Sequence, residues 1–174
     1  PRVWLADRRL DGVEFGTAGL RLAPNLRALL VAQQTSAGLG EQNPTSGKLY
    51  RVPIRDGRPG RLRTVWESLP GDLPDGFGIA ESGRVYLATA GLSQQIVVIG
   101  RDGQEVERFP GTPATGDNGS PVPFDTPSSA TFRGNRILVA NQSYVGNSSH
   151  HAILEVKVGE RGVPVFIPSG AGVR

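Results

Sequence analysis

The sequence predicts an all-β protein built from repeated β-propeller blades. Its 24 glycines and 14 prolines, which show no collagen-like period, are typical of a chain rich in turns. Helical spacing of apolar residues is absent except for a weak pattern over 25–31. Three short apolar runs, LLVA, VYLA and ILVA, end at Ala32, Ala88 and Ala140, so they recur about every 50 residues, a spacing that indicates a repeat architecture.

Each of these runs is the second strand of an expected β-hairpin. In the clearest case, LPDGFGIAESGRVYLA over 73–88, a Pro-Asp-Gly turn opens the first strand and a Glu-Ser-Gly turn leads into the second. The corresponding hairpins cover 19–32 and 128–140. The repeat therefore favours a strand over a helix for the weakly periodic segment that follows Pro24.

A second hairpin follows each of the first ones, so every repeat is expected to hold four strands. Asp-Gly between two apolar runs is a strong hairpin signal, and it occurs at 56–57 and 102–103. The paired runs are 48–54 with 62–66, 95–99 with 105–109, and 152–158 with 163–167. Four strands in about 50 residues make a propeller blade. We expect blades at approximately 13–67, 73–110 and 125–168 in a single partial propeller domain, 1–174.

The segment Val3-Trp4-Leu5-Ala6 is expected to be a leftover N-terminal strand that closes an earlier blade. Propellers typically have four to eight blades, so three blades predict that the ring is completed by missing N-terminal blades or by a second copy of the chain. A sandwich or an irregular barrel is the alternative architecture. The matched order of hairpin, loop and hairpin favours blades.

Composition narrows the classes of function. The absence of cysteine excludes disulfides and thiolate chemistry. No apolar run reaches the length of a membrane span, and both a cytoplasmic and an exported location stay open. The net charge of +3 comes almost entirely from arginines spread along the chain, whereas nucleic-acid-binding proteins usually concentrate them on one face. The pattern therefore argues against a nucleic-acid partner.

Asp75 is the main candidate for a functional residue, because it stands at the mouth of an inner strand and faces a loop-lined opening. The alternative is that its carboxylate only bonds to the backbone of its own Asp-Gly turn. His150 and His151 are adjacent, so on a strand they would face opposite ways and could not easily share one metal. Asp117 and Asn118 either line the cavity mouth or form turns.

Two long loops, 32–47 and 111–126, are rich in Gly, Pro, Ser and Asn. Loops of this length are usually functional or disordered. Neither contains the Gly-Lys-Ser/Thr end of a phosphate-binding loop, and no Gly-x-Ser-x-Gly motif marks a nucleophilic serine.

Three segments resemble the senescence marker protein/gluconolactonase/luciferin-regenerating-enzyme-like family of six-bladed propellers. Residues 73–76 with 83–88 resemble its Pro-Asp-Gly blade, 124–134 with 137–140 its last inner hairpin, and 3–7 with 15–20 its middle blade. Their order matches the C-terminal half of a family member. The resemblance implies a metal-dependent hydrolase of sugar lactones or related small esters, with one divalent cation, Ca²⁺ or Zn²⁺, and a small-molecule lactone or ester as partner.

The resemblance also implies that Asp75 is both a metal ligand and the catalytic general base. The family's Asn ligand corresponds to Ala18, and its Glu ligand corresponds to a position upstream of Pro1. A methyl group cannot bind a hard cation, which requires oxygen ligands. The implied site is therefore incomplete or degenerate in this chain, and the alternative is a non-catalytic propeller segment that binds a ligand or a protein.

Overall fold

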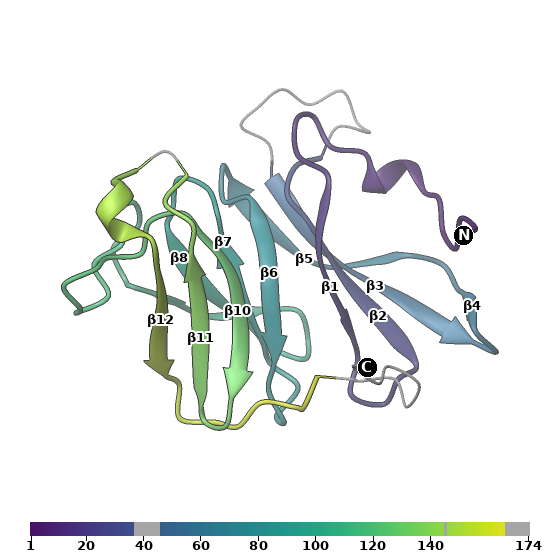
Figure 1. The fold of residues 1–174 in the computed structure, drawn as a ribbon. Coiled ribbons are helices and arrows are strands. Elements are labelled where there is room, and N and C mark those ends of the chain that lie inside the picture. The colour runs from purple at the N-terminus through teal and green to yellow at the C-terminus, as the bar shows by residue number, and fades with distance from the viewer. Residues whose placement is uncertain (37–45, 145, 166–174) are drawn as a thin grey trace.

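The computed structural model describes residues 1–36, 46–144 and 146–165. Its strands form three antiparallel sheets, which are arranged one beside the next (Figure 1). The helical pieces among the described residues are two 3₁₀ turns, η1 (Arg8–Leu10) and η2 (Ser148–His150). None of these described helices has the length or the apolar character needed to cross a membrane. The structure confirms the all-β prediction and fits a partial propeller.

The first sheet follows the chain from its inner to its outer strands. These are β1 (Thr17–Leu22), β2 (Ala28–Gln33), β3 (Ser46–Arg55) and, on the far side of β3, β5 (Arg63–Pro70), with a short β4 (Arg58–Pro59) folded back on the end of β3. Asp56 and Gly57 both have positive φ in the β3–β4 turn, as the Asp-Gly signal predicts. The segment with weak helical spacing forms strand β2 from Ala28 onward.

The second and third sheets repeat this plan. The second is β6 (Pro74–Ile79), β7 (Val85–Thr89), β8 (Gln95–Ile99) and β9 (Glu105–Phe109), and the third is β10 (Pro127–Arg133), β11 (Arg136–Asn141) and β12 (Ala152–Lys157). The innermost strands β1, β6 and β10 each have a register irregularity near their first residues. A bulge at that place redirects the side chains at the mouth of each inner strand.

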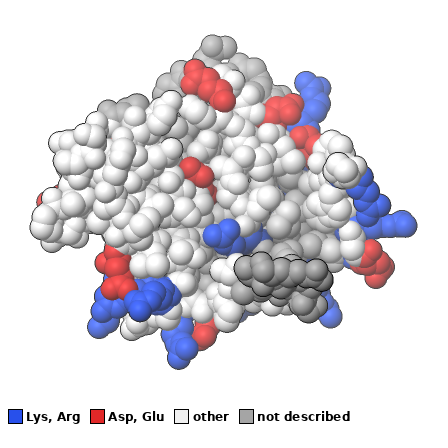
Figure 2. All heavy atoms as spheres, viewed as in Figure 1, with Lys and Arg blue, Asp and Glu red and all other residues white. Residues whose placement is uncertain are grey.

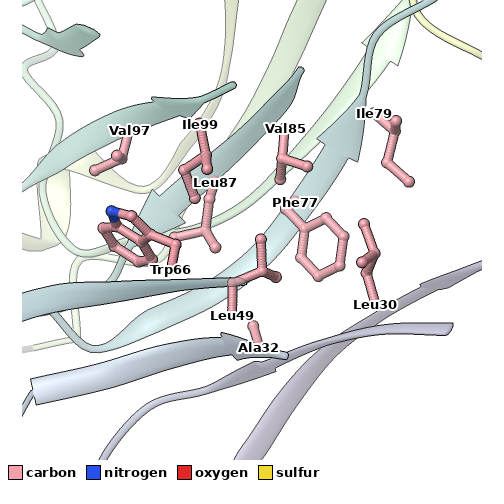
Figure 3. Close-up of a cluster of buried hydrophobic side chains, with 10 residues drawn as sticks. All are labelled: Leu30, Ala32, Leu49, Trp66, Phe77, Ile79, Val85, Leu87, Val97 and Ile99. Carbon is pink, nitrogen blue, oxygen red and sulfur yellow. The ribbon is translucent and has the colours of Figure 1, made fainter. Parts of the chain in front are cut away.

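The core lies between the sheets, and the middle sheet is covered on both faces. Successive residues of a strand face opposite ways, so β7 and β8 send alternate side chains to each neighbour. Leu87 and Val97 pack toward the first sheet, whereas Tyr86 and Ile96 pack toward the third. Figure 3 shows the first of these clusters. It consists of Leu30, Ala32, Leu49, Trp66, Phe77, Ile79, Val85, Leu87, Val97 and Ile99.

The N-terminal segment differs from the prediction, because residues 3–6 do not form a strand. Trp4 and Leu5 instead pack on the outer face of the first sheet, beside Val31 and Val52. The Trp4 indole donates to the Gly57 carbonyl over 2.9 Å. Residues 3–6 form no ladder with a described strand, and this packing and the indole hydrogen bond hold the segment in place.

The end of the third repeat also differs from the prediction. Of the expected strand 163–167, residues 166 and 167 lie outside the described residues, and 163–165 do not pair with β12. The chain crosses instead to β6, where the Val163 N–H donates to the Ile79 carbonyl over 2.9 Å. Pro164 has no N–H to offer, which makes this segment a poor ladder strand. The third sheet thus has three strands among the described residues, with β12 at its edge.

Candidate functional site

The inner strands β1, β6 and β10 begin at the same end of the molecule, shown at the top of Figure 1. A cavity of about 290 Å³ opens there, and its walls come from all three sheets: Phe15, Gln34, Leu73, Asp75, Ala90, Thr126, Gln142 and Tyr144. A second cavity of about 420 Å³ shares Phe15, Leu73, Ala90, Thr126 and Tyr144 with the first. The shared walls make the two cavities parts of one cleft, with Asp75 on one side of it.

Local backbone geometry places Asp75 in this cleft. Leu73 has a φ of 53° directly before Pro74, and the β6–β7 register shifts between Pro74 and Phe77. Thr126 repeats the same φ before Pro127 in the third sheet. Left-handed backbone at non-glycine residues is strained, and such residues concentrate at functional sites.

Gly76 allows β6 and β10 to approach closely beside Asp75. A Cβ atom at Gly76 would lie 2.5 Å from the Ser129 hydroxyl oxygen, so any larger residue would push the two inner strands apart. On the other side, Gly19 of β1 lies against the Asp75 carbonyl. Ala18, which corresponds to the family's Asn ligand, therefore lies on the neighbouring inner strand, as the repeat predicts.

The cleft contains two glutamines that the sequence reasoning missed. Gln34 and Gln142 occupy equivalent positions, two residues after the LLVA and ILVA runs, and Ala90 is their counterpart after VYLA. Their backbone N–H groups donate to equivalent carbonyls: Gln34 to Gly16, Ala90 to Leu73, and Gln142 to Thr126. The signal was the repeat itself, since aligned positions of a propeller point at the same central opening.

The Asp75 carboxylate is half-buried, and burial raises its pKa to about 6. Hydrogen bonds from the Gln34 side chain and the Gly76 backbone N–H work in the opposite direction without offsetting the burial. No lysine or arginine is among the described residues that line the cleft. A carboxylate desolvated in this way, without a nearby cation, has the proton affinity of a general base at near-neutral pH.

A buried polar cluster supports one wall of the cleft. Asp125, which is 5% exposed, receives three hydrogen bonds on one carboxylate oxygen: from the Ser143 hydroxyl over 2.9 Å, the Asn147 backbone N–H over 3.0 Å and His150 Nδ1 over 2.9 Å. Burial alone would raise the pKa of Asp125, but these bonds outweigh it and hold the pKa below its usual value. We call Asp125, Ser143, Asn147 and His150 the Asp125 cluster.

The Asp125 cluster holds the segment that carries Gln142 and Tyr144 into the cleft. Ser143 has a φ of 48°, and its backbone N–H donates to the Asp125 carbonyl over 2.8 Å. Ser143 and His150 contact the same carboxylate oxygen, whereas a catalytic triad would need a bond between the serine and the histidine. The cluster is therefore a positioning device.

The other candidates have local roles. Asp117 accepts a hydrogen bond from the Gly119 N–H over 3.2 Å, and Asn118 accepts one from the Ser120 N–H over 2.9 Å. Neither residue lines the cleft, so both act as turn formers. His151 is an exposed residue that ends η2.

The donors around Asp75 meet the needs of a divalent cation only in part. The side chains of Gln34, Thr126 and Gln142 offer oxygen, which suits Ca²⁺ better than Zn²⁺, whose usual ligands are nitrogen and sulfur. Asp75 is the one carboxylate on this wall, and the described residues contain no group of three His, Cys, Asp or Glu able to hold a metal. These residues therefore do not form a complete cation site.

Comparison with known proteins identifies the fold. No family model and no curated protein matches the sequence. Among solved structures, a gluconolactonase from Xanthomonas campestris is similar over 72% of this chain and 35% of its own, with 23% identity and a TM-score of 0.51. Regucalcin from Agrobacterium tumefaciens, described as a calcium-binding protein, is similar over 86% of this chain and 63% of its own, with 15% identity and a TM-score of 0.54.

Both neighbours are β-propeller proteins, so the predicted propeller fold is confirmed. The chain spans about a third of the length of the gluconolactonase and 63% of that of regucalcin. At these identities the likeness concerns the fold, and the chemistry has to be argued from the cleft.

Proposed function

We propose that the chain forms part of the active site of a gluconolactonase-like hydrolase that acts on lactones or related small esters. The observation that supports this most is the half-buried Asp75 carboxylate, directed into a cleft at the mouths of three inner strands. A fold neighbour that is a gluconolactonase adds support from the architecture.

Asp75 serves as the general base in this proposal. Its carboxylate takes a proton from a water molecule, whose oxygen attacks the carbonyl carbon of the lactone. The bond from that carbon to the ring oxygen then breaks, and the ring oxygen takes the proton back from Asp75. The product is a hydroxy acid. The hydrogen bond from Gln34 orients the carboxylate, and a positioned base of this kind contributes about 10²–10⁴-fold to the rate.

We further propose that the hydrolase depends on a divalent cation, as the family resemblance implies, with Asp75 as the ligand from this chain. The remaining ligands would come from N-terminal blades or from a second copy, because the described residues supply a single carboxylate. Since the set is incomplete, we assign no step of the reaction to the metal.

Asp75→Asn tests the proposal, because the amide keeps the shape of the side chain but cannot take a proton at neutral pH. We expect kcat for lactone hydrolysis to fall at least about a hundredfold. Asp117→Asn is the matched control, since this exposed aspartate lies outside the cleft, and it should leave the rate unchanged. Hydrolysis at near wild-type rate by Asp75→Asn would remove Asp75 from the mechanism.

The second candidate function is that of a non-catalytic module that binds a ligand in the same cleft. Ala18 favours it, because a methyl group stands where the family has a metal ligand. The two functions are separated by measuring both binding and turnover. A lactone that binds in the cleft but is not hydrolysed in the presence of Ca²⁺, Mg²⁺, Mn²⁺ or Zn²⁺ would establish the binding module.

A further inference from the structure

We infer that the substrate of this site is an uncharged lactone or ester that carries an apolar arm, and that it is not a polyhydroxylated sugar lactone. The inference rests on the proposed function and concerns the part of the cleft that lies beyond Asp75. Three features lead to it: exposed apolar side chains at the cleft, the absence of basic groups from its described walls, and the mainly apolar lining of the larger cavity beyond Asp75.

The apolar side chains are large and exposed. Leu92 and Tyr144 are each 73% exposed, and Phe15 is 44% exposed, although all three line the cleft. Scattered apolar residues on a surface need no explanation, but several that converge on one cleft indicate a binding site. Leu73 and Ala90 continue this apolar surface to the edge of the Asp75 cavity.

The charges around the cleft disfavour an anionic substrate. Its charged lining residues are Glu14 and Asp75, both acidic, and its described walls contain no lysine or arginine. In Figure 2, acidic side chains and uncharged atoms occupy most of the upper part of the molecule, where the inner strands begin, and basic ones lie mainly at the margins. The described walls themselves therefore offer no basic partner for a phosphate or carboxylate on the substrate.

The polar groups lie mainly around Asp75, where a lactone ring would bind. Gln34, Asp75, Thr126 and Gln142 line the smaller cavity. The larger cavity includes the polar residues Glu14, Gln94 and Thr126, but most of its wall is apolar and contains Leu92 beside Phe15 and Tyr144. Sugar hydroxyls placed against those apolar walls would lose their hydrogen bonds to water without replacement, at a substantial cost in affinity. An alkyl or aryl arm would gain free energy at the same place.

The Asp125 cluster fixes the backbone next to Tyr144, on the apolar side of the cleft. Tyr144 follows Ser143, whose hydroxyl and backbone N–H both bond to Asp125. A side chain that is 73% exposed would ordinarily sit on a loose loop, yet the residue before it is tied to a carboxylate that is only 5% exposed. Anchoring of the adjacent backbone restricts the region that the Tyr144 ring can reach, which lowers the ordering cost of binding an apolar arm there.

The test compares kcat/KM of the full chain for γ-lactones with alkyl arms of two to eight carbons and for glucono-δ-lactone. Each methylene that is fully buried is worth up to about a fourfold gain, so we expect kcat/KM to rise about twofold to fourfold per carbon. In Leu92→Asn this dependence on arm length should flatten. Val106→Asn, an exposed apolar residue of β9 outside the cleft, is the matched control and should keep it.

Measurements of ligand binding distinguish a failure of this inference from a failure of the proposed function. If no lactone is hydrolysed, calorimetry with the non-hydrolysable lactams of the same series still reports the preference of the cleft. Tighter binding of longer arms, lost in Leu92→Asn, would support the inference. A preference for the polyhydroxylated lactone or lactam, or an arm-length dependence unaffected by Leu92→Asn, would overturn it while leaving Asp75 as the base.

Discussion

At the scale of single residues, Asp75 combines two properties that oppose each other. Its position in a bulge of β6 brings it to the cleft, and the same position removes water from its carboxylate and raises its pKa to about 6. A carboxyl with a raised folded-state pKa is costly to ionise in the native protein. In the proposed mechanism Asp75 must be ionised at neutral pH, and this charged form destabilises the fold.

This opposition predicts how stability depends on pH. Because the folded-state pKa of Asp75 is about 6 and its ordinary value is 3.8, its contribution to stability is greatest below pH 4 and is lost as the pH rises through 6. Asp75→Asn cannot ionise, so in chelator we expect the variant to be more stable than wild type by roughly 1–3 kcal/mol at pH 8, with little difference at pH 4. Urea unfolding at both pH values measures this.

A loss of stability in Asp75→Asn would indicate a structural role for the carboxylate. A variant less stable than wild type at pH 8 would show that the carboxylate is needed to hold the Asp-Gly turn, which is the alternative reading of the motif.

At the scale of elements, the Asp125 cluster anchors a segment whose described residues, 142–144 and 146–151, form no strand. Between β11 and β12 the chain is held by three donors on one carboxylate oxygen, and Asn141 at the end of β11 completes the anchor by accepting the Asp125 backbone N–H over 2.8 Å. A buried carboxylate satisfied in this way fixes a loop more firmly than surface contacts do.

Asp125→Ala should therefore loosen this segment selectively. It leaves the Asn147 N–H and His150 without their acceptor, which predicts a loss of roughly 2–4 kcal/mol in the free energy of unfolding. Hydrogen exchange measured by mass spectrometry should show faster exchange over 142–150 and little change over 85–99. Asp117→Ala, which removes an exposed aspartate from a turn, is the control for a general effect of losing a carboxylate. Unchanged exchange over 142–150 would contradict the role of the anchor.

At the scale of the whole molecule, the first and third sheets differ in how far their outer surfaces are covered. The outer face of the first sheet is covered by Trp4 and Leu5. The third sheet ends in β12, which pairs with β11 alone among the described strands and exposes 69% of Ile153. Unpaired backbone on an edge strand invites pairing with another chain, and lysine on such a strand prevents it.

We therefore predict that the chain self-associates through β12. Sedimentation at increasing protein concentration should reveal dimers or larger species for the wild type, and Ile153→Lys should reduce them by placing a charge on the edge. Val13→Lys, an exposed apolar residue outside the described strands, is the control and should associate like the wild type. A wild-type chain that stays monomeric throughout would show that its edges are protected.

Local signals in the sequence determined the hairpins. Turn residues such as Asp56-Gly57 and the apolar runs ending at Ala32, Ala88 and Ala140 act over a few residues, so strand positions and the place of Asp75 at a strand mouth were predictable from sequence. The same signals misplaced 3–6, which lacks a described strand to pair with, and 163–165, which crosses to Ile79. Residues nearby in the sequence specify neither the missing ladder at 3–6 nor the crossing at 163–165.

The tertiary structure alone decided what surrounds Asp75. Gln34 reaches its carboxylate from the neighbouring sheet, and Tyr144 enters the cleft because Asp125, far from it in sequence, binds the residue before it. The raised pKa of Asp75 is a consequence of burial by all three sheets. Hydrogen bonds and desolvation depend on which residues meet in space, and those meetings arise from the packing of whole sheets, which a local sequence pattern does not specify.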